Sequence, residues 1–496
     1  MPHGDAHHVD RTTGAWLRRS TTGLVVMALL IAAASYRLDL GPRWSGAGRS
    51  PVAAPAADDT PAADDTPAGA AGPQELSLPP VPDVDAVADP LVPVAADTRA
   101  VRRTVRSFVS DRRLGPDVAV AVSQLFEGRS LYRVGPSRMV PASTLKLLIT
   151  GAALLRLGED HRFATRVVDG TARREIVLVG GGDPFLAREP APDEVYPPRA
   201  DLVTLARSTA RALRDQGRTR VRLRYDASLF TGPSSSPRWE ASYLPDNVVS
   251  PISALWVDGG RQPDSFVRSA DPALDAARAF ARALRSQRIT VMGEPEDAMA
   301  PDGTEGAELA IVQSAPLAQV VERVLDVSDN EAAEVLGRHV ALAAGEPASF
   351  AGASRAVDDT LRGVGVDTAR ASIYDGSGLS RDNRLAPETL LSVLETAASP
   401  DHPELRPLLT GLPVAGFTGS LTYRFDTGAP QGLGIVRAKT GTLSGVHGLA
   451  GTLTTRDGVV LAFVAMADRV RLRNTLDARA VLDRIAAALA ACRCAA

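Results

Sequence analysis

Lysine is almost absent from this chain of 496 residues. Lysine and arginine together number 55, yet only Lys146 and Lys439 are lysines. Richness in arginine and alanine indicates a compositional bias that replaces lysine wherever either cation serves. Such a bias should spare lysine only where arginine fails, and arginine does not give up its proton in proteins. The positions of the two lysines are therefore candidates for chemistry.

Cysteine and aromatic residues are also scarce. The two cysteines, Cys492 and Cys494, form a C-x-C near the end of the sequence, a spacing that favours neither an intramolecular disulfide nor a metal site. We predict free thiols there, no metal and no other cofactor. Aromatic residues make up 4% of the chain and the net charge is −3. No basic stripe interleaved with aromatics is present, which excludes nucleic acid as a partner.

No apolar run reaches the length of about 20 residues that a membrane-spanning helix needs. The run at residues 22–35 follows Arg18 and Arg19 and is typical of a signal peptide or a short signal anchor. We predict that residues 1–39 are a cytoplasmic tail plus such a signal peptide or signal anchor. Either form exports the remainder to the outer face of the plasma membrane or the cell wall, and an uncleaved segment tethers it to the membrane.

Composition also divides the rest of the chain. Residues 40–97 are rich in proline, alanine and aspartate, cannot bury a core and are expected to be a disordered linker. Folded structure should begin near Asp97. Strand and helix patterns in residues 98–165 and 311–496 predict one α/β catalytic domain built from both parts. Residues 166–310 are then an inserted domain.

The spacing of apolar residues and the turn signals predict individual elements within these parts. Helices are expected over residues 98–113, 141–158, 201–216, 272–286, 316–326, 331–344 and 475–490. Strands are expected over residues 117–125, 131–134, 432–440, 446–455 and 459–467.

Ser143 and Lys146 lie three residues apart on the helix expected over 141–158, so their side chains share one face. A serine hydroxyl is a weak nucleophile until a neighbouring base takes its proton. Lysine is such a base only when burial or a nearby positive charge lowers its pKa. A serine at a helix N-terminus also places its backbone N–H where a developing oxyanion is stabilised. Alone the pair is a weak signal, because most S-x-x-K sequences are surface helix pairs.

Two further motifs lie downstream. Residues 328–330 read Ser-Asp-Asn between two expected helices, and alone they indicate a helix-to-helix turn with an asparagine cap. Residues 439–442 read Lys-Thr-Gly-Thr after an apolar strand. A cationic lysine beside a hydroxyl suits a carboxylate, and the missing side chain of Gly441 leaves room for a ligand backbone.

The order S-x-x-K, S-D-N, K-T-G is the set known for penicillin-interacting serine acyl-enzymes, and each lysine of the chain falls in one of these motifs. Over roughly residues 98–490 the chain resembles the class C low-molecular-mass penicillin-binding proteins, the D-alanyl-D-alanine carboxypeptidase/endopeptidase family. Other segments that resemble this family are residues 178–184, 226–230, 250–255 and 375–381.

The resemblance implies a penicillin-binding/β-lactamase-like transpeptidase domain, an antiparallel sheet flanked by helices, with one inserted α/β domain. It also implies a serine D,D-carboxypeptidase or endopeptidase that cleaves peptidoglycan stem peptides or cross-links and is acylated by β-lactam antibiotics. Ser143 would be the nucleophile, Lys146 its base and Ser328 a proton relay. Backbone N–H groups of Ser143 and Thr442 would form the oxyanion hole. The implied substrate-binding residues are Asn330, Lys439, Thr440, Gly441, Thr442 and Arg381.

Other functions are alternatives, and the catalytic residues permit the first of them. A penicillin-binding sensor or wall-binding protein that stays acylated would need the same residues. A β-lactamase shares the motifs, but no Glu-x-x-Leu-Asn follows Ser328 to activate a deacylating water. A Ser-His-Asp hydrolase is disfavoured because no G-x-S-x-G occurs and the seven histidines are scattered.

Overall fold

The computed structural model describes residues 94–301 and 308–496, which belong to one compact unit, Ala88–Ala496. The predicted targeting segment, residues 1–39, lies outside the described residues, and so does nearly all of the predicted linker, residues 40–97. Those predictions are not tested by the structure. No helix among the described residues is long and apolar enough to cross a membrane.

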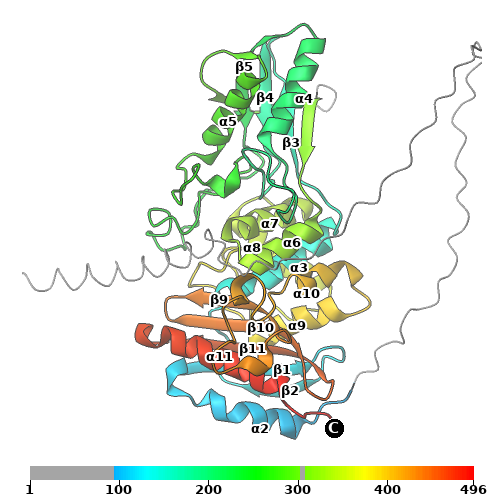
Figure 1. The fold of residues 1–496 in the computed structure, drawn as a ribbon, viewed down its shortest axis with the longest axis vertical. Coiled ribbons are helices and arrows are strands. Elements are labelled where there is room, and N and C mark those ends of the chain that lie inside the picture. The colour runs from blue at the N-terminus through cyan, green and yellow to red at the C-terminus, as the bar shows by residue number, and fades with distance from the viewer. Residues whose placement is uncertain (1–93, 302–307) are drawn as a thin grey trace, which may run out of the picture. The chain divides into compact units, whose positions relative to one another are not determined.

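A five-stranded antiparallel sheet forms the centre of the part of the chain that carries the three motifs (Figure 1). Its strand order is β2-β1-β11-β10-β9, so β1 pairs with β11 and joins the first two strands to the last three. The apolar runs at β1 and β11 are buried along nearly their whole length, as expected for strands covered on both faces. The strands are β1 (Asp117–Gln124), β2 (Ser130–Val134), β9 (Arg437–Leu443), β10 (Val446–Thr454) and β11 (Val460–Asp468).

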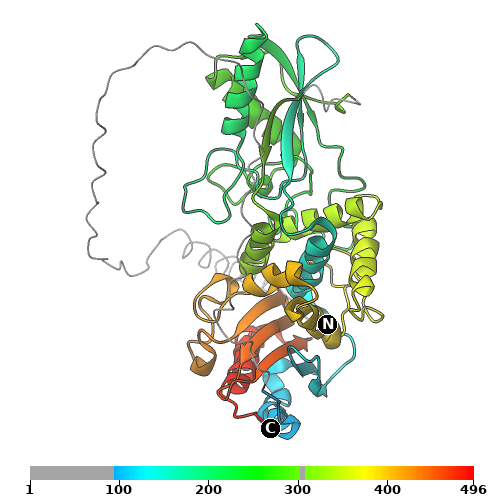
Figure 2. The ribbon, with the colours of Figure 1, turned by 90° about the vertical axis from the view of Figure 1, so that its right-hand side faces the viewer.

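Helices cover both faces of this sheet. The first and last helices, α2 (Thr98–Val109) and α11 (Thr475–Ala490), pack together on one face, and Figure 2 shows α11 in red against the orange strands. The side chain of Asp97 caps α2 by accepting a hydrogen bond from the backbone N–H of Arg99, 2.8 Å away. On the opposite face, α3 (Lys146–Leu157) and α9 (Pro387–Ala398) share a second core with the sheet.

Three further helices pack onto α3 in this second core: α6 (Leu317–Val327), α7 (Asn330–Ala343) and α8 (Phe350–Gly363). The first two agree with the helices predicted over 316–326 and 331–344. No prediction covered α8, α9 or the short α10 (Arg406–Thr410).

A second, six-stranded sheet occupies the middle of the sequence, with order β6-β5-β4-β3-β8 and β7 paired to β5. It is mixed, because β3 pairs antiparallel with β4 and β8 whereas β5 runs parallel to β4, β6 and β7. Its helices α4 and α5 share a separate apolar core with it. The elements are β3 (Ala164–Asp169), β4 (Glu175–Val179), α4 (Leu202–Asp215), β5 (Arg220–Asp226), α5 (Pro272–Ser286), β6 (Thr290–Val291), β7 (Glu296–Asp297) and β8 (Glu308–Gln313).

The predicted fold class, a helix-flanked antiparallel sheet with an inserted α/β part, is therefore confirmed. The predicted limits of the insertion, residues 166 and 310, fall inside β3 and β8, which both belong to the second sheet.

The prediction of free thiols in the C-terminal tail was wrong. The structure joins Cys492 and Cys494 in a disulfide, with their Cα atoms 5.4 Å apart, inside the range that a disulfide accepts. A spacing of two residues brings the two Cα atoms this close once the chain turns after α11. The tail then pairs with the start of the described chain through Ala96 and Ala495.

Candidate active site

The nucleophile candidate sits in a turn of 3₁₀-helix, η2 (Ala142–Leu145), directly before α3. The hydroxyl and the backbone N–H of Thr144 both donate to the carbonyl of Pro141, at 2.7 and 3.2 Å, and so tighten the turn. In a 3₁₀-helix, side chains three residues apart eclipse one another. This geometry brings Ser143 Oγ to 2.9 Å from Lys146 Nζ. The pair predicted on one α-helical face thus meets at the junction of two kinds of helix.

Lys146 is fully buried, and its amine has three neighbours. Nζ lies 2.9 Å from Ser143 Oγ, 2.8 Å from Asn330 Oδ1 and 2.5 Å from the carbonyl oxygen of Ser377. A neutral amine has two N–H bonds and one lone pair, and the amide and carbonyl oxygens accept both N–H bonds. The lone pair is then left for the hydroxyl of Ser143.

Burial lowers the pKa of Lys146 to about 8. Four carboxylates oppose this shift, those of Asp375, Asp329, Glu334 and Glu331. A pKa near 8 suits a general base, because the neutral form is accessible near neutral pH while the proton is still held firmly. Of the two causes expected for such a shift, burial and a nearby positive charge, burial is the larger one here.

The Ser-Asp-Asn motif forms the joint between α6 and α7. Ser328 ends α6 in a left-handed conformation with φ 61°, and the carboxylate of Asp329 caps α7 by accepting from the backbone N–H of Ala332 at 2.9 Å. The capping residue is therefore Asp329 and not the predicted asparagine, Asn330. This joint turns the side chains of Ser328 and Asn330 toward Ser143 in one cavity.

The cavity has a volume of about 320 Å³. Five of the predicted site residues line it, one or more from each motif: Ser143, Ser328, Asn330, Thr440 and Thr442. Three residues that were not predicted also line it: Ser420, Arg424 and Arg479. The structure thus gathers the three motifs, which are separated by long stretches of sequence, around one hollow.

Three predicted substrate-binding residues are not among those that line the cavity. Lys439 is fully buried and donates to the carbonyl oxygen of its neighbour Thr440 at 3.0 Å. Burial and the charge of Lys146 hold its pKa well below the usual value. Arg381 is tied to Glu240 at 2.6 Å and to the carbonyl oxygen of Ser444 at 2.9 Å.

A glycine is required at position 441, but not to leave room for a ligand backbone as predicted. A Cβ at this position would lie 2.6 Å from the carbonyl oxygen of Pro141 and 3.2 Å from the backbone nitrogen of Thr144. The absent side chain therefore lets β9 approach the turn that carries Ser143. This close approach keeps Thr440 and Thr442 at the cavity wall beside the nucleophile.

The unpredicted arginines differ in their partners. Arg424 is paired with the carboxylate of Asp483 on α11, with Nε 3.0 Å from Oδ2. Burial and the neighbouring charge of Arg424 lower the pKa of Arg479, and no hydrogen bond of its guanidinium is found within the described residues. Both lie outside any motif, in a chain where arginine is common, so the sequence carried no signal for them.

The fold and the cavity define the class of the protein. A cavity-lining serine in contact with a buried lysine at the head of a helix, packed against an antiparallel sheet, is the arrangement of penicillin-interacting serine enzymes. In agreement, the structure matches that of penicillin-binding protein 4 from Haemophilus influenzae with a TM-score of 0.62, over 78% of this chain and 98% of that one, at 23% sequence identity.

The chain belongs to the D-Ala-D-Ala carboxypeptidase 3 (S13) family, whose model matches residues 101–266 and 261–489. It is 40% identical to carboxypeptidase Rv3627c of Mycobacterium tuberculosis, over 81% of this chain and 88% of that protein. It is 38% identical to carboxypeptidase DacB of Mycolicibacterium smegmatis, over 84% of this chain and 91% of that protein. The predicted family and enzyme class, a serine-type D-Ala-D-Ala carboxypeptidase, are confirmed.

Proposed function

We propose that this enzyme hydrolyses D-Ala-terminated peptidoglycan stem peptides or cross-links through an acyl-enzyme on Ser143. The observation that carries the proposal is the contact of 2.9 Å between Ser143 Oγ and the buried amine of Lys146. The family to which the chain belongs, D-Ala-D-Ala carboxypeptidase 3, supports the choice of substrate.

In the acylation step Ser143 Oγ attacks the carbonyl carbon of the penultimate D-Ala, and its proton passes to Lys146 Nζ. The Oγ–C bond forms, and the C–N bond to the terminal residue then breaks. The leaving amine must gain a proton, and Ser328, which lines the same cavity, would relay it from Lys146. Backbone N–H groups of Ser143 and Thr442 would stabilise the oxyanion between these events.

Deacylation follows the same steps as acylation, with water in place of the serine hydroxyl as the nucleophile. Lys146, neutral again after the amine has left, accepts a proton from the attacking water and returns it to Ser143 Oγ as the ester bond to Ser143 breaks. The products are the shortened peptide and the regenerated serine.

Substrate binding would involve the remaining groups of the cavity. Asn330 Oδ1 is occupied by Lys146 at 2.8 Å, so its Nδ2 is the atom available for a substrate carbonyl. Thr440 and Thr442 offer hydroxyls to the terminal carboxylate. The side chain of Lys439 is fully buried and does not line the cavity. We therefore assign the cationic partner of that carboxylate to Arg479, which does line it.

Replacement of this arginine tests that assignment. In Arg479→Gln we expect kcat/KM for a D-Ala-D-Ala peptide to fall about tenfold to hundredfold, mainly through KM, because a charged hydrogen bond worth about 1.5–3 kcal/mol is lost. A peptide ending in a carboxamide should be a poor substrate for the wild type and should lose little more in the variant. Arg484→Gln on the same helix, beside Asp111 at 4.0 Å, is the matched control. If kcat/KM of Arg479→Gln falls equally for the peptide that ends in a carboxylate and the peptide that ends in a carboxamide, the assignment is contradicted.

The pH dependence of acylation is set by the protonation state of the general base, Lys146. Only the neutral form of Lys146 accepts a proton, so kcat/KM should rise with pH below the lysine pKa and level off above it. The midpoint is expected at about pH 8. Initial rates of D-Ala release measured over a pH series, on enzyme whose fold is checked by circular dichroism at each pH, give the profile. A rate that stays flat through this range would argue against Lys146 as the base.

The function itself is tested by incubating the protein with a D-Ala-D-Ala peptide and measuring the D-Ala released. Release with turnover supports the peptidase. Lasting acylation by a penicillin without release of D-Ala would instead indicate a sensor, and fast hydrolysis of nitrocefin would indicate a β-lactamase. A structure of penicillin-binding protein 4 from Haemophilus influenzae holds a β-lactam, which supports penicillin as the probe.

We also propose that the enzyme works outside the plasma membrane, as the apolar run at residues 22–35 behind Arg18 and Arg19 indicates. Residues 1–39 would direct export or anchor the chain, and residues 40–97 would separate the folded part from the membrane. Protease digestion of intact cells is expected to remove the enzyme, whereas a cytoplasmic protein should survive.

A further inference from the structure

A tight turn at residues 375–380 holds one side of the catalytic amine. Its Ser377 carbonyl oxygen lies 2.5 Å from Lys146 Nζ and 3.4 Å from Ser143 Oγ. If this oxygen moves, one N–H bond of the neutral amine loses its acceptor, and nothing then directs the lone pair to the serine hydroxyl. The orientation of the base therefore depends on how firmly the turn is held.

The carboxylate of Asp375 is buried at the centre of the turn. Most groups that donate to it belong to the turn itself or directly follow it: the hydroxyl of Ser377, the backbone N–H groups of Gly378 and Ser380, and the side-chain amide of Asn383. One donor comes from a distant part of the sequence, the indole Nε1–H of Trp239, at 2.8 Å from Asp375 Oδ2. The local hydrogen bonds fix the shape of the turn, whereas the bond from Trp239 ties the turn to a distant segment of the chain.

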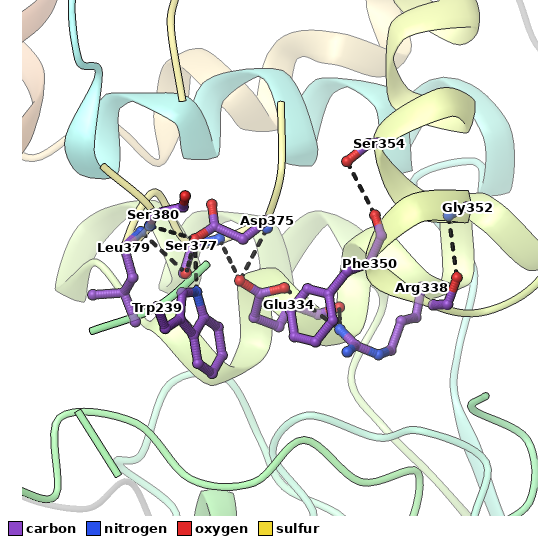
Figure 3. A network of polar contacts seen from close by, with 12 residues as sticks. Trp239, Glu334, Arg338, Phe350, Gly352, Ser354, Asp375, Ser377, Leu379 and Ser380 are labelled. Atoms are coloured by element: carbon purple, nitrogen blue, oxygen red, sulfur yellow. Dashed lines mark hydrogen bonds and ion pairs between the residues drawn. The ribbon is translucent and has the colours of Figure 1, made fainter. Parts of the chain in front are cut away.

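Trp239 also reaches the turn by a second route, which Figure 3 shows. Its ring meets Phe350 edge to face at 5.4 Å, and the guanidinium of Arg338 lies 4.2 Å above the Phe350 ring. Arg338 pairs with Glu334, whose carboxylate accepts the backbone N–H groups of Gly376 and Ser377, both at 2.9 Å. The tryptophan thus touches both systems that hold the turn.

The hydrogen bond from Trp239 to Asp375 joins two distant parts of the chain. Trp239 lies in the long segment between β5 and α5, whose strand and helix belong to the second sheet and its core. Lys146, by contrast, begins the helix behind the five-stranded sheet. We propose that Trp239 is a positioning residue for catalysis: its indole N–H anchors Asp375 and thereby holds the Ser377 carbonyl against the amine of Lys146.

The inserted part of the chain is then a component of the catalytic apparatus in addition to any role in substrate access. This inference rests on the proposed function, because it assumes that Lys146 is the base. A shift of the Ser377 carbonyl should slow the chemical step and leave substrate binding nearly intact, since Trp239 does not line the cavity.

The test compares two tryptophans of the same segment. Trp239→Phe removes the N–H donor and keeps an aromatic ring against Phe350. Trp256→Phe removes a similar buried N–H, but this N–H donates to the carbonyl oxygen of Asp183 at 3.0 Å and not to Asp375. Active sites are first titrated with a penicillin, so that rates are expressed per functional site and a fraction of misfolded protein has no influence.

In Trp239→Phe we expect kcat per titrated site to fall about tenfold, with KM within about twofold of the wild type. Trp256→Phe should keep both constants within about twofold. If the two variants have the same kcat per site, the inference is overturned. If the wild type itself neither releases D-Ala nor becomes acylated, the proposed function has failed instead.

A double-mutant cycle shows whether the tryptophan acts through the carboxylate. Asp375→Asn alone should lower kcat per site at least about tenfold, and it serves as the test if Trp239→Phe does not fold. In the Asp375→Asn background, Trp239→Phe should cost less than about twofold more. A full further loss in that background, or wild-type kcat in Asp375→Asn, contradicts the proposed path.

Discussion

Ser143→Ala is expected to take up no penicillin and to lose peptidase activity by at least about 10⁴-fold. Several hydroxyls line the cavity, but Ser143 is the one that the amine of Lys146 contacts, at 2.9 Å. Thr440 instead donates its hydroxyl to Ser420 at 2.9 Å. Among the described residues, Ser143 carries the hydroxyl that is hydrogen-bonded to this amine, so no other hydroxyl should replace the missing nucleophile.

Intact-protein mass spectrometry after incubation with a penicillin measures this outcome, and peptide mapping of the wild type locates the adduct. Ser420→Ala is the matched control, because it removes a hydroxyl from the same cavity and should still be acylated at Ser143. An adduct of undiminished yield in Ser143→Ala would refute the assignment of the nucleophile.

Lys146→Arg should have the second large effect. Arginine keeps the positive charge and can donate to the Ser377 carbonyl and the Asn330 amide oxygen, but it does not give up its proton. The rate constant for acylation by a penicillin is therefore expected to fall by about 10²–10⁴, the usual contribution of a general base. Because arginine is larger than the buried lysine, Lys146→Met, which fits the space better, should give a loss of the same order.

The other lysine provides the comparison. Lys439→Arg is expected to have a smaller effect, since the Lys439 amine contacts the carbonyl oxygen of Thr440 and no contact with Ser143 is found. Stopped-flow measurement of acylation for the three variants gives the ranking. Should Lys439→Arg prove the more damaging change, the roles of the two amines would have to be exchanged.

Much of the central fold could be predicted from local pattern. The strands β1, β10 and β11 are long apolar runs, and helices such as α5 and α11 carry regular apolar spacing with clear ends. The site motifs were also visible, because lysine survives in an arginine-rich chain only at Lys146 and Lys439. Local sequence therefore located most of the residues that line the cavity.

What the sequence did not reveal depends on contacts between distant segments. Nothing near Trp239 indicates a hydrogen bond to Asp375, since that bond exists only after two separate parts of the chain have packed together. The burial of Lys439 and the exposure of Arg479 to the cavity are likewise set by packing. The tail disulfide was missed because its geometry depends on the turn after α11.

The strand order β2-β1-β11-β10-β9 has a consequence for biosynthesis. The serine and its base are made early, whereas the three strands that complete the sheet lie between residues 437 and 468. Until these strands arrive, β1 has a neighbour on one side only, and the threonines of β9 are missing from the cavity. Pairing across so many residues is slow. A ribosome must therefore deliver the chain as far as Asp468 before any molecule can hydrolyse peptidoglycan.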